Sequence, residues 1–296
     1  MLLFHPAFQA DPQRRLSFLF DEIQHYLLFA AGAFVLFWLV LDRPLARRKL
    51  ARHPRPALGQ VISESVFSIA SKLVMVATSM WISYVAYTGG AADQRYTDLA
   101  EYGYAYYGFT LFAVFFVHDT WFYWFHRLMH RPELFRTIHR THHESRDPTP
   151  FTTFHFHPLE AVLEGVAGKA IILPLMLLPW HTSVPIVWAS GMVLFNTIAH
   201  LGYEVYPSWW HRVPILSGKT TAMHHYLHHQ RVAGNYALYF RFWDRLCGTE
   251  FPDFEARYAD RFRREARPPT APQPTAPQPP TTPAPTTPPA PTTSTV

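Results

Sequence analysis

Residues 118–143 read HDTWFYWFHRLMHRPELFRTIHRTHH, an aromatic, apolar run that is followed by a series of histidines. The first two of that series, His126 and His130, stand four residues apart. This spacing places both side chains on one face of an α-helix. The apolar run extends back to residue 104. The stretch therefore predicts a long helix that carries imidazoles at its C-terminal end.

The same stretch closes with a histidine triplet, His139, His142 and His143, at the spacing i, i+3 and i+4. The spacing recurs in HHYLHH, residues 224–229. On a helix, three side chains at these positions point the same way. A repeated triplet of this kind has little ordinary explanation as a polar helix face, so it indicates metal binding.

The whole chain holds 18 histidines among 296 residues, an unusually high number. Imidazole nitrogen suits iron, zinc, copper and nickel, whereas magnesium and calcium prefer oxygen ligands. A catalytic zinc ion needs about three protein ligands. The two triplets, with His126, His130, His157 and His200, supply more nitrogen atoms than one metal ion can take. We therefore expect two metal ions.

Isolated histidines have a simpler interpretation as hydrogen-bonded polar groups. This interpretation applies to His5, His25, His53, His181 and His211. His118, at the end of an apolar run, is expected to be structural or to support a ligand. His155 and His224 are weaker candidates, because each stands close to a better-placed histidine and would point elsewhere.

Five apolar runs predict helices that cross or enter a membrane: residues 26–41, 66–87, 104–125, 161–180 and 184–200. A full span needs about 20 apolar residues, so the last two are expected to form a hairpin of spans or half-spans. The basic loop that follows the first run predicts a cytoplasmic position. Alternation of the runs then places every histidine group on the cytoplasmic face.

The fold predicted from these features is all-α. About four spans, or a mix of spans and half-spans, would support a cytosolic helical cap that holds a histidine-rich dimetal site. The expected divisions are an N-terminal segment (1–22), a membrane-embedded domain (23–265) and a Pro/Thr-rich tail (266–296). The tail has no charge pattern or apolar periodicity, so disorder is expected there.

Composition excludes several other classes of protein. The single cysteine, Cys247, rules out an intrachain disulfide and a cysteine-ligated iron–sulfur cluster. The net charge of +5 comes with basic residues beside apolar runs, where membrane topology explains them better than nucleic-acid binding does.

The histidine motifs resemble those of the sterol desaturase/fatty acid hydroxylase superfamily of membrane di-iron oxygenases. The matching text is HDTWFYWFHRLMH, HRTHHES, FHPLE, HLGYE and HHYLHHQRVAGNYALYFRFWDRLCGT, within residues 118–249. The resemblance implies two iron ions and the ligands His126, His130, His139, His142, His143, His157, His200, His225, His228 and His229.

Other residues at family-like positions are expected to support those ligands: Asp119, Glu160, Asn196, Glu204 and His224. Glu160 and Asp119 are the expected hydrogen-bond partners of ligating imidazoles, which commonly donate their second N–H to a carboxylate. Some members have a histidine where this chain has Asn196, so this coordination position is expected to be water, a supporting contact or empty. Asn235 and Asp244 are interpreted as turn residues.

The resemblance implies O2-dependent oxidation of lipid C–H bonds, either hydroxylation or desaturation, in lipid biosynthesis. A sterol and a fatty acyl chain both remain open as substrates. The sequence holds no haem, flavin or nicotinamide fingerprint, so a separate electron donor is expected, a ferredoxin or a b-type cytochrome with its reductase. The membrane would be the bacterial inner membrane or the endoplasmic reticulum.

Two alternatives from other functional classes stay open. A metal transporter would place ionisable residues along a path across the membrane, whereas here the histidines are expected beyond the ends of the spans. A non-catalytic membrane protein that binds metal is the second alternative, and it would keep metal without turning over O2.

Overall fold

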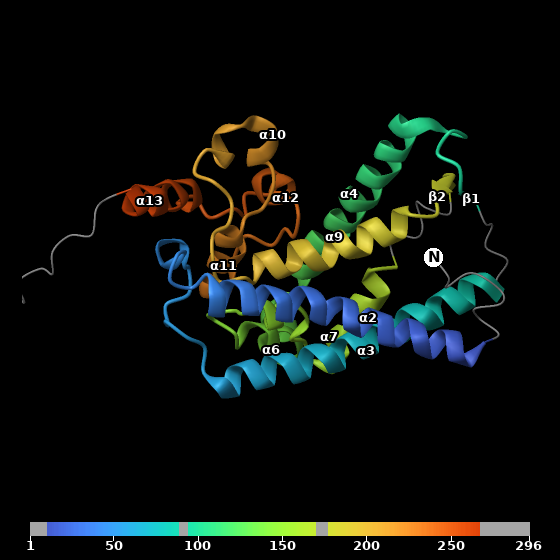
Figure 1. The fold of residues 1–296 in the computed structure, drawn as a ribbon, viewed down its shortest axis with the longest axis horizontal. Helices are drawn as coiled ribbons and strands as arrows, with labels where there is room; N and C mark the ends of the chain where they lie inside the picture. Colours follow the sequence, from blue (N-terminus) through green and yellow to red (C-terminus); the bar gives the residue numbers. More distant parts are fainter. Residues whose placement is uncertain (1–10, 89–93, 170–176, 267–296) are drawn as a thin grey trace, which may run out of the picture.

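The computed structural model describes residues 11–88, 94–169 and 177–266, and most of them are helical (Figure 1). The longest helices, which follow the length of the molecule, are α2 (Pro12–Ala33), α3 (Leu58–Thr88), α4 (Gly103–Met129) and α9 (Val184–Ala199). This mostly helical architecture confirms the coarse fold class. The predicted tail lies, apart from Ala266, outside the described residues.

The first helix begins earlier than the apolar run predicts. Asp11 caps α2, because its Oδ1 accepts hydrogen bonds from the backbone N–H groups of Gln13 (2.9 Å) and Arg14 (3.4 Å). Proline at the first helical position strengthens this start. The helix continues into the π-helical segment η2 (Phe34–Val40). The predicted boundary between residues 22 and 23 therefore falls inside one helix.

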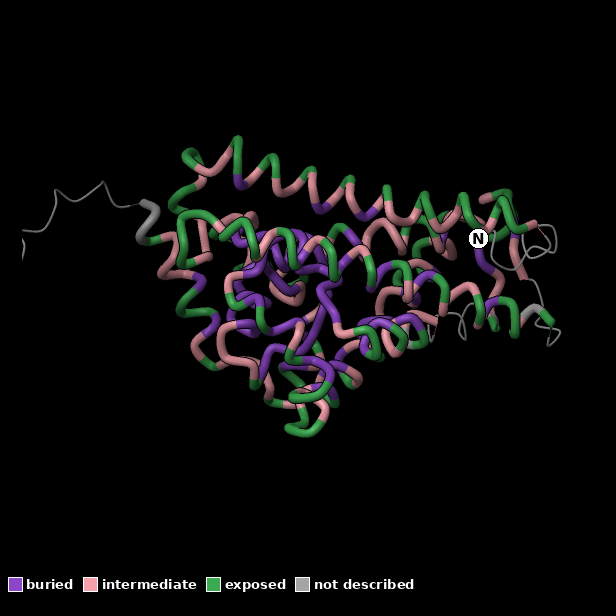
Figure 2. Tube along the Cα trace, turned by 90° about the horizontal axis from the view of Figure 1, so that it is seen from below, coloured by how far each residue is buried: buried purple, intermediate pink, exposed green. Residues whose placement is uncertain are grey.

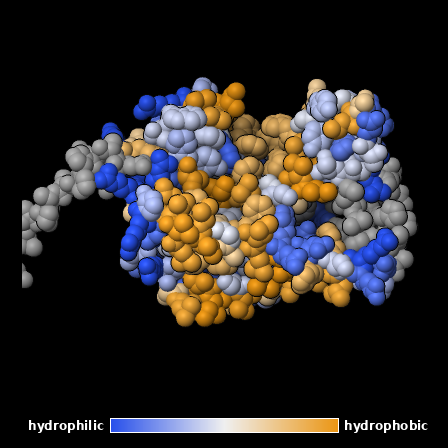
Figure 3. All heavy atoms as spheres, in the orientation of Figure 1, coloured by the Kyte–Doolittle hydropathy of each residue, from blue (hydrophilic) through white to orange (hydrophobic). Residues whose placement is uncertain are grey.

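Two helical stretches of the described chain are long and apolar enough to cross a membrane, Pro12–Val40 and Leu58–Ala86, each of 29 residues. Only 17% and 22% of their most apolar windows are buried within the molecule, which is unlike the core helix of a soluble protein. Leu28, Leu39 and Trp81 are among their exposed side chains. Figure 3 shows hydrophobic side chains spread over the middle of the visible face.

The remaining apolar runs are less simple than predicted. Although α4 has 27 residues, it contains several tyrosines as well as the pair His118 and Asp119, and it does not reach the same hydropathy. Helix α9 has 16 residues. The run at 161–180 begins as α7 (Pro158–Ala167), and residues 170–176 lie outside the described chain. The predicted count of about four spans is therefore not confirmed.

A short parallel pair of strands, β1 (Arg95–Tyr96) and β2 (Trp180–His181), lies at one end of the molecule. The strands come shortly before α4 and α9, so their pairing brings the N-terminal ends of these two helices together. The opposite ends of both helices carry histidines.

Short helices gather in the half of the molecule where α4 and α9 end; Figure 1 shows α10 to α13 at its far end and α6 nearer the middle. We call this group of short helices the cap. In chain order the short helices are η3 (Ala46–Arg48), α5 (Pro132–Leu134), η4 (Phe135–His139), α6 (Arg140–His143), η5 (Pro150–Phe154), η6 (Trp210–Arg212), α10 (Pro214–Ser217), α11 (Ala222–Arg231), α12 (Phe242–Leu246) and α13 (Phe254–Ala266). Figure 2 shows the buried residues concentrated in this half of the molecule.

The buried segment η5 joins the cap to the long helices. The Phe151 carbonyl accepts hydrogen bonds from the hydroxyls of Tyr26 in α2 (3.2 Å) and Ser68 in α3 (2.5 Å). Phe154 packs edge-on against Tyr26, with 5.3 Å between the ring centroids. This anchor follows the first histidine triplet in the chain and therefore holds that part of the chain against the two helices that are long and apolar enough to cross a membrane.

Candidate metal centre

The first histidine group gathers five imidazoles from four segments. His126 comes from α4 and His130 caps its end, while His139, His143 and His228 come from η4, α6 and α11. One nitrogen atom from each lies within 4.8 Å of the corresponding atoms of the others. The closest approach joins the Nε2 atoms of His126 and His139, at 3.1 Å.

The second histidine group contains four imidazoles, His142, His200, His225 and His229, all buried. The Nε2 atoms of His225 and His200 are 3.0 Å apart, and those of His200 and His142 are 3.4 Å apart. His200 caps the C-terminus of α9, so this helix delivers its only ligand candidate at its last turn.

Each triplet contributes two histidines to one group and one histidine to the other group. From the first triplet, His139 and His143 join the first group and His142 joins the second. From HHYLHH, two histidines join the second group and His228 joins the first. Successive residues of an α-helix are rotated by about 100°, so positions i+3 and i+4 lie on either side of position i. Each triplet can therefore face two neighbouring sites.

The two groups are adjacent. Ring centroids of His142 and His229, within the second group, are 4.6 Å apart, and those of His143 and His229, one from each group, are 4.9 Å apart. The arrangement thus offers two nitrogen-lined positions side by side, as a pair of metal ions would require.

Backbone carbonyls determine the tautomer of several imidazoles. Nδ1 of His126 lies 2.8 Å from the Tyr236 carbonyl, and Nδ1 of His228 lies 2.7 Å from the Gly234 carbonyl. A carbonyl oxygen only accepts hydrogen bonds, so each Nδ1 carries the proton and each Nε2 keeps a lone pair. The second group repeats this pattern, because Nδ1 of His200 and Nδ1 of His229 also approach carbonyls, of Asn196 and Ser145.

Each group therefore contains at least two Nε2 lone pairs that converge without a proton between them. Such atoms repel one another unless a cation lies among them, and Nε2 of His228 indeed has no hydrogen-bond partner among the described residues. Nitrogen lone pairs aimed at one point are the donor set that iron, zinc or copper takes. The residues present therefore fit a metal ion at each group.

Burial keeps the imidazoles of the cap neutral. It lowers the pKa values of His142, His143 and His225 well below the ordinary value, and the neighbouring imidazoles lower these pKa values further. Neutral imidazole is the form that ligates metals, so the site needs no proton loss at physiological pH before a metal ion binds.

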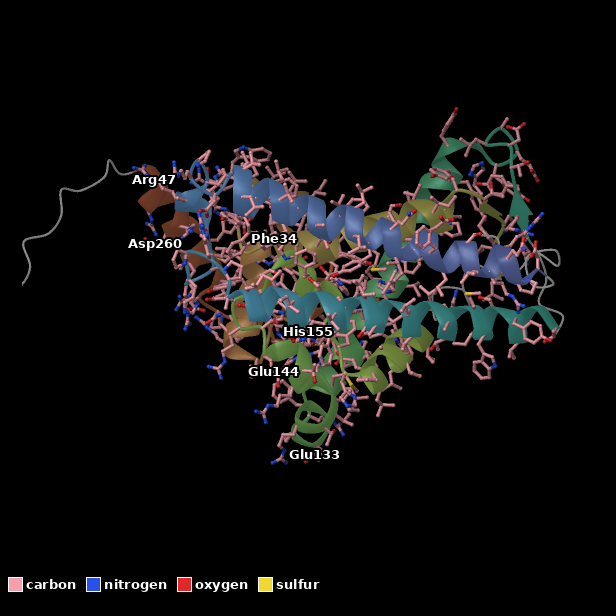
Figure 4. The ribbon with its side chains drawn as sticks, turned by 60° about the horizontal axis from the view of Figure 1, so that its bottom comes forward. Phe34, Arg47, Glu133, Glu144, His155 and Asp260 are labelled. Atoms are coloured by element: carbon pink, nitrogen blue, oxygen red, sulfur yellow. The ribbon has the colours of Figure 1, made fainter. Side chains whose placement is uncertain are left out.

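His157 is the one predicted ligand that the structure does not bring to either group. It is the N-cap residue of α7, and its Nδ1 accepts a hydrogen bond from the Leu159 backbone N–H at 3.2 Å. Its neighbour His155 is buried against Phe67 and also lies outside both groups. Figure 4 shows His155 beside α3.

The carboxylates expected to support the ligands have different roles. Glu160 lies as expected, with its Oε1 2.5 Å from Nδ1 of His139. Asp119 instead accepts hydrogen bonds from the backbone N–H groups of Leu238 and Tyr239, at 3.2 and 2.7 Å. Neither donor is a histidine of the two groups. The position of Asp119 explains how α4 holds the loop after α11.

Of the other supporting candidates, Asn196 and Glu204 contact backbone groups, whereas His224 faces a carboxylate. The Asn196 carbonyl accepts from His200, while its side-chain amide reaches the Thr153 carbonyl at 3.4 Å. Glu204 accepts from the Met223 backbone N–H at 2.9 Å and so caps α11. His224 is fully buried but points away from the groups, with Nε2 3.7 Å from Asp244.

Two residues that the sequence suggests as turn formers do more than turn the chain. Asn235 has a positive φ of 56°, and its side chain joins the His224 carbonyl (2.8 Å) to the Phe251 N–H (2.9 Å). Asp244 accepts from the backbone N–H groups of Tyr236 and Ala237, both at 2.9 Å. Asn235 and Asp244 hold the loop whose carbonyls orient His126 and His228. In the sequence, the GNY and WDR motifs are the features that could have indicated this role.

Residues 111–249 match the family model described as fatty acid hydroxylase. The chain is similar to methylsterol monooxygenase 1 of Rattus norvegicus, with 33% identity over 134 residues, 45% of this chain and 44% of the relative. It is 37% identical over 143 residues to methylsterol monooxygenase erg25B of Aspergillus fumigatus, 47% of each chain.

A third relative, C-4 methylsterol oxidase erg25 of Schizosaccharomyces pombe, is 35% identical over 157 residues, 50% of this chain and 49% of the relative. The chain thus spans about half the length of the curated relatives it matches. No solved structure matches it. The matched region contains both histidine groups completely.

Proposed function

Because residues 111–249 belong to the sterol desaturase/fatty acid hydroxylase superfamily, we propose that the chain is an O2-dependent oxidoreductase of a lipid. Two iron ions would be held by the two histidine groups. The observation that carries this proposal is the convergence of nine buried or half-buried imidazoles, with unprotonated nitrogens, at two adjacent points.

Iron is favoured over zinc by the chemistry that the superfamily performs. Zinc has no redox activity, whereas oxidation of an unactivated carbon by O2 needs a cofactor that changes its oxidation state. Bound iron would supply the activation of O2. The protein's own groups would orient the ligands, through Glu160 and the loop carbonyls, and would exclude bulk water by burial.

We further propose that the metal centre faces the cytoplasm. The basic loop after the first apolar helix contacts the same region as the histidines: the Leu50 N–H donates to the Gly202 carbonyl (2.8 Å), two residues after His200. Gln60, at the start of α3, donates to the Asp147 carbonyl (2.9 Å). An excess of arginine and lysine in a short loop favours the cytoplasmic side.

A sterol is the first substrate to test, because the relatives named above are methylsterol enzymes. Fatty acyl chains are the second, given the name of the family model. Electrons would come from a separate ferredoxin or b-type cytochrome. Exposed Arg131 and Arg136, near the first histidine group, offer a basic surface for an acidic donor.

The test is the metal content of the purified protein, measured by elemental mass spectrometry. We expect about two iron ions per chain, and loss of one in His228→Ala and of a different one in His142→Ala, because the two residues belong to different groups. The double variant should lose both. His157→Ala is the matched control and should keep both ions, since it lies outside the groups.

Wild-type protein that is folded and holds one metal ion or none would overturn the proposed centre. Two ions without O2-dependent oxidation of any sterol or fatty acyl lipid, in the presence of a reductant, would instead identify a non-catalytic metal-binding protein.

A further inference from the structure

Of the polar atoms outside the metal centre that are buried without a hydrogen-bond partner among the described residues, three belong to neighbouring side chains: Nδ1 of His118, Nε1 of Trp188 and Oη of Tyr239. The His118 and Tyr239 side chains are 6% and 1% exposed. An unsatisfied buried polar atom costs free energy, so a protein rarely keeps three of them together without a use.

The three side chains meet at one place, although they come from α4, α9 and the loop after α11. Ring centroids of His118 and Trp188 are 5.1 Å apart, and those of His118 and Tyr239 are 5.5 Å apart. The Trp188 indole also lies near the Tyr239 hydroxyl, but neither atom has a hydrogen bond of acceptable geometry. We call these three residues the His118 cluster.

Aromatic side chains connect the His118 cluster to the metal centre. His118, Phe122 and His126 follow one face of α4 at intervals of four residues, with ring centroids 6.5 and 5.0 Å apart. Phe115 and Phe195 pack on Tyr239, at 5.2 and 6.0 Å. The cluster therefore holds polar groups within an aromatic region that extends to His126, a candidate metal ligand of the first histidine group.

The chemistry of the three atoms selects one kind of ligand. The indole N–H only donates, so its partner must be an acceptor, whereas the phenol and the imidazole can each donate or accept. An oxygen atom satisfies all three groups together. The cluster contains no ionised side chain, and the neighbouring Asp119 carboxyl group, which accepts from the Tyr239 backbone N–H at 2.7 Å, disfavours an anionic ligand group.

We propose that the His118 cluster binds a hydroxyl or carbonyl oxygen of the lipid substrate. The inference rests on the proposed function and adds a recognition point to it. The eight residues from His118 to His126 correspond to a rise of about 12 Å along an α-helix. A lipid bound by its oxygen at the cluster would thus present a carbon about that far away to the metal centre.

The experiment compares binding of cholestanol with binding of cholestane, the same skeleton without the oxygen, and of hexadecanol with hexadecane. Competition binding to the iron-loaded protein in nanodiscs needs no turnover. Wild type should prefer at least one oxygen-bearing probe over its hydrocarbon by about tenfold, the usual order for one satisfied hydrogen bond. Tyr239→Phe and Trp188→Phe should each reduce that preference severalfold.

Thermal unfolding of the same ligand-free variants separates recognition from a structural role. Tyr239→Phe removes an unpartnered hydroxyl, so its Tm should stay equal or rise. The control Tyr26→Phe removes a buried hydroxyl that has a partner, the Phe151 carbonyl, so its Tm should fall while the lipid preference is kept.

The inference is overturned if wild type does not distinguish either pair of probes, or if both phenylalanine variants leave the preference intact, whatever their Tm. Iron content is measured in every sample. Protein without iron would refute the proposed function, whereas iron-loaded protein that ignores the oxygen would refute only the role of the His118 cluster.

Discussion

At the scale of single residues, the contact between Glu160 and His139 is the clearest side-chain support for a ligand candidate. Because a carboxylate partner orients the imidazole and raises its basicity, Glu160→Gln should weaken metal binding at the first histidine group by about 10- to 100-fold. Competition with a chelator measures this. The second group should be unaffected.

Glu133→Gln provides the matched control for that substitution, because Glu133 is exposed in α5 and projects away from the long helices (Figure 4). Equal metal affinity in wild type and Glu160→Gln would show that the short contact does not orient His139.

Asn235 permits a second prediction at this scale. Asn235→Ala removes both side-chain hydrogen bonds of a buried residue and should lower the free energy of unfolding by about 2 kcal/mol or more. Asn235→Gly also loses the bonds but adopts φ 56° freely, so it should be about 1 kcal/mol less damaging. Thermal unfolding in detergent distinguishes the two variants. If both lose the same free energy of unfolding, the positive φ of residue 235 makes no measurable contribution to stability.

At the scale of elements, the cap depends on an ion pair between α12 and the segment before α13. Arg241 is 1% exposed, and its Nε lies 2.5 Å from Oε1 of Glu250. Burial would raise the pKa of Glu250, but the hydrogen-bonded Arg241 guanidinium and the nearby His224 imidazole, 3.7 Å away, outweigh burial and lower the pKa to about 2.

The sign of the resulting pH dependence follows from this direction. A carboxyl group with a lowered pKa stabilises the folded state above its ordinary pKa, and the contribution disappears as the pH falls toward the folded value. Between about pH 4.5 and about pH 2, wild type should therefore lose stability that Glu250→Gln already lacks. Parallel Tm profiles of the two proteins over that window would contradict the prediction.

The elements themselves were only partly predictable from the sequence. Apolar runs predicted the positions of α2, α3, α4 and α9, because burial in lipid or protein selects such runs wherever they occur. The start of α2 depends on the cap at Asp11 rather than on hydropathy. The run at 161–180 was predicted to form a span or a half-span; α7 covers its start as far as Ala167, and residues 170–176 lie outside the described chain.

At the scale of the whole molecule, the orientation in the membrane is the main open prediction. In a Cys247→Ser background, a cysteine introduced by Arg136→Cys or Arg52→Cys should react with an impermeant thiol reagent only from the cytoplasmic side. One introduced by Asp98→Cys, in the loop before α4, should react only from the opposite side. Reaction of all three positions from one side would contradict the crossing pattern.

The sequence by itself determined the kind of site, because residue type and spacing along a helix are local properties. Two histidine triplets, an excess of imidazole and apolar runs were sufficient to predict a helical protein with two adjacent metal positions. Nine of the ten predicted ligands do lie in two groups, and their binding of metal remains a prediction.

Only the tertiary structure decided which imidazole belongs to which position. His142 meets His200 from 58 residues away, and Ser145 orients His229 from 84 residues away. Spacing cannot reveal that His157 caps α7, or that Asp119 holds the loop after α11. Contacts between distant segments depend on how the helices pack, and packing is a property of the folded chain as a whole.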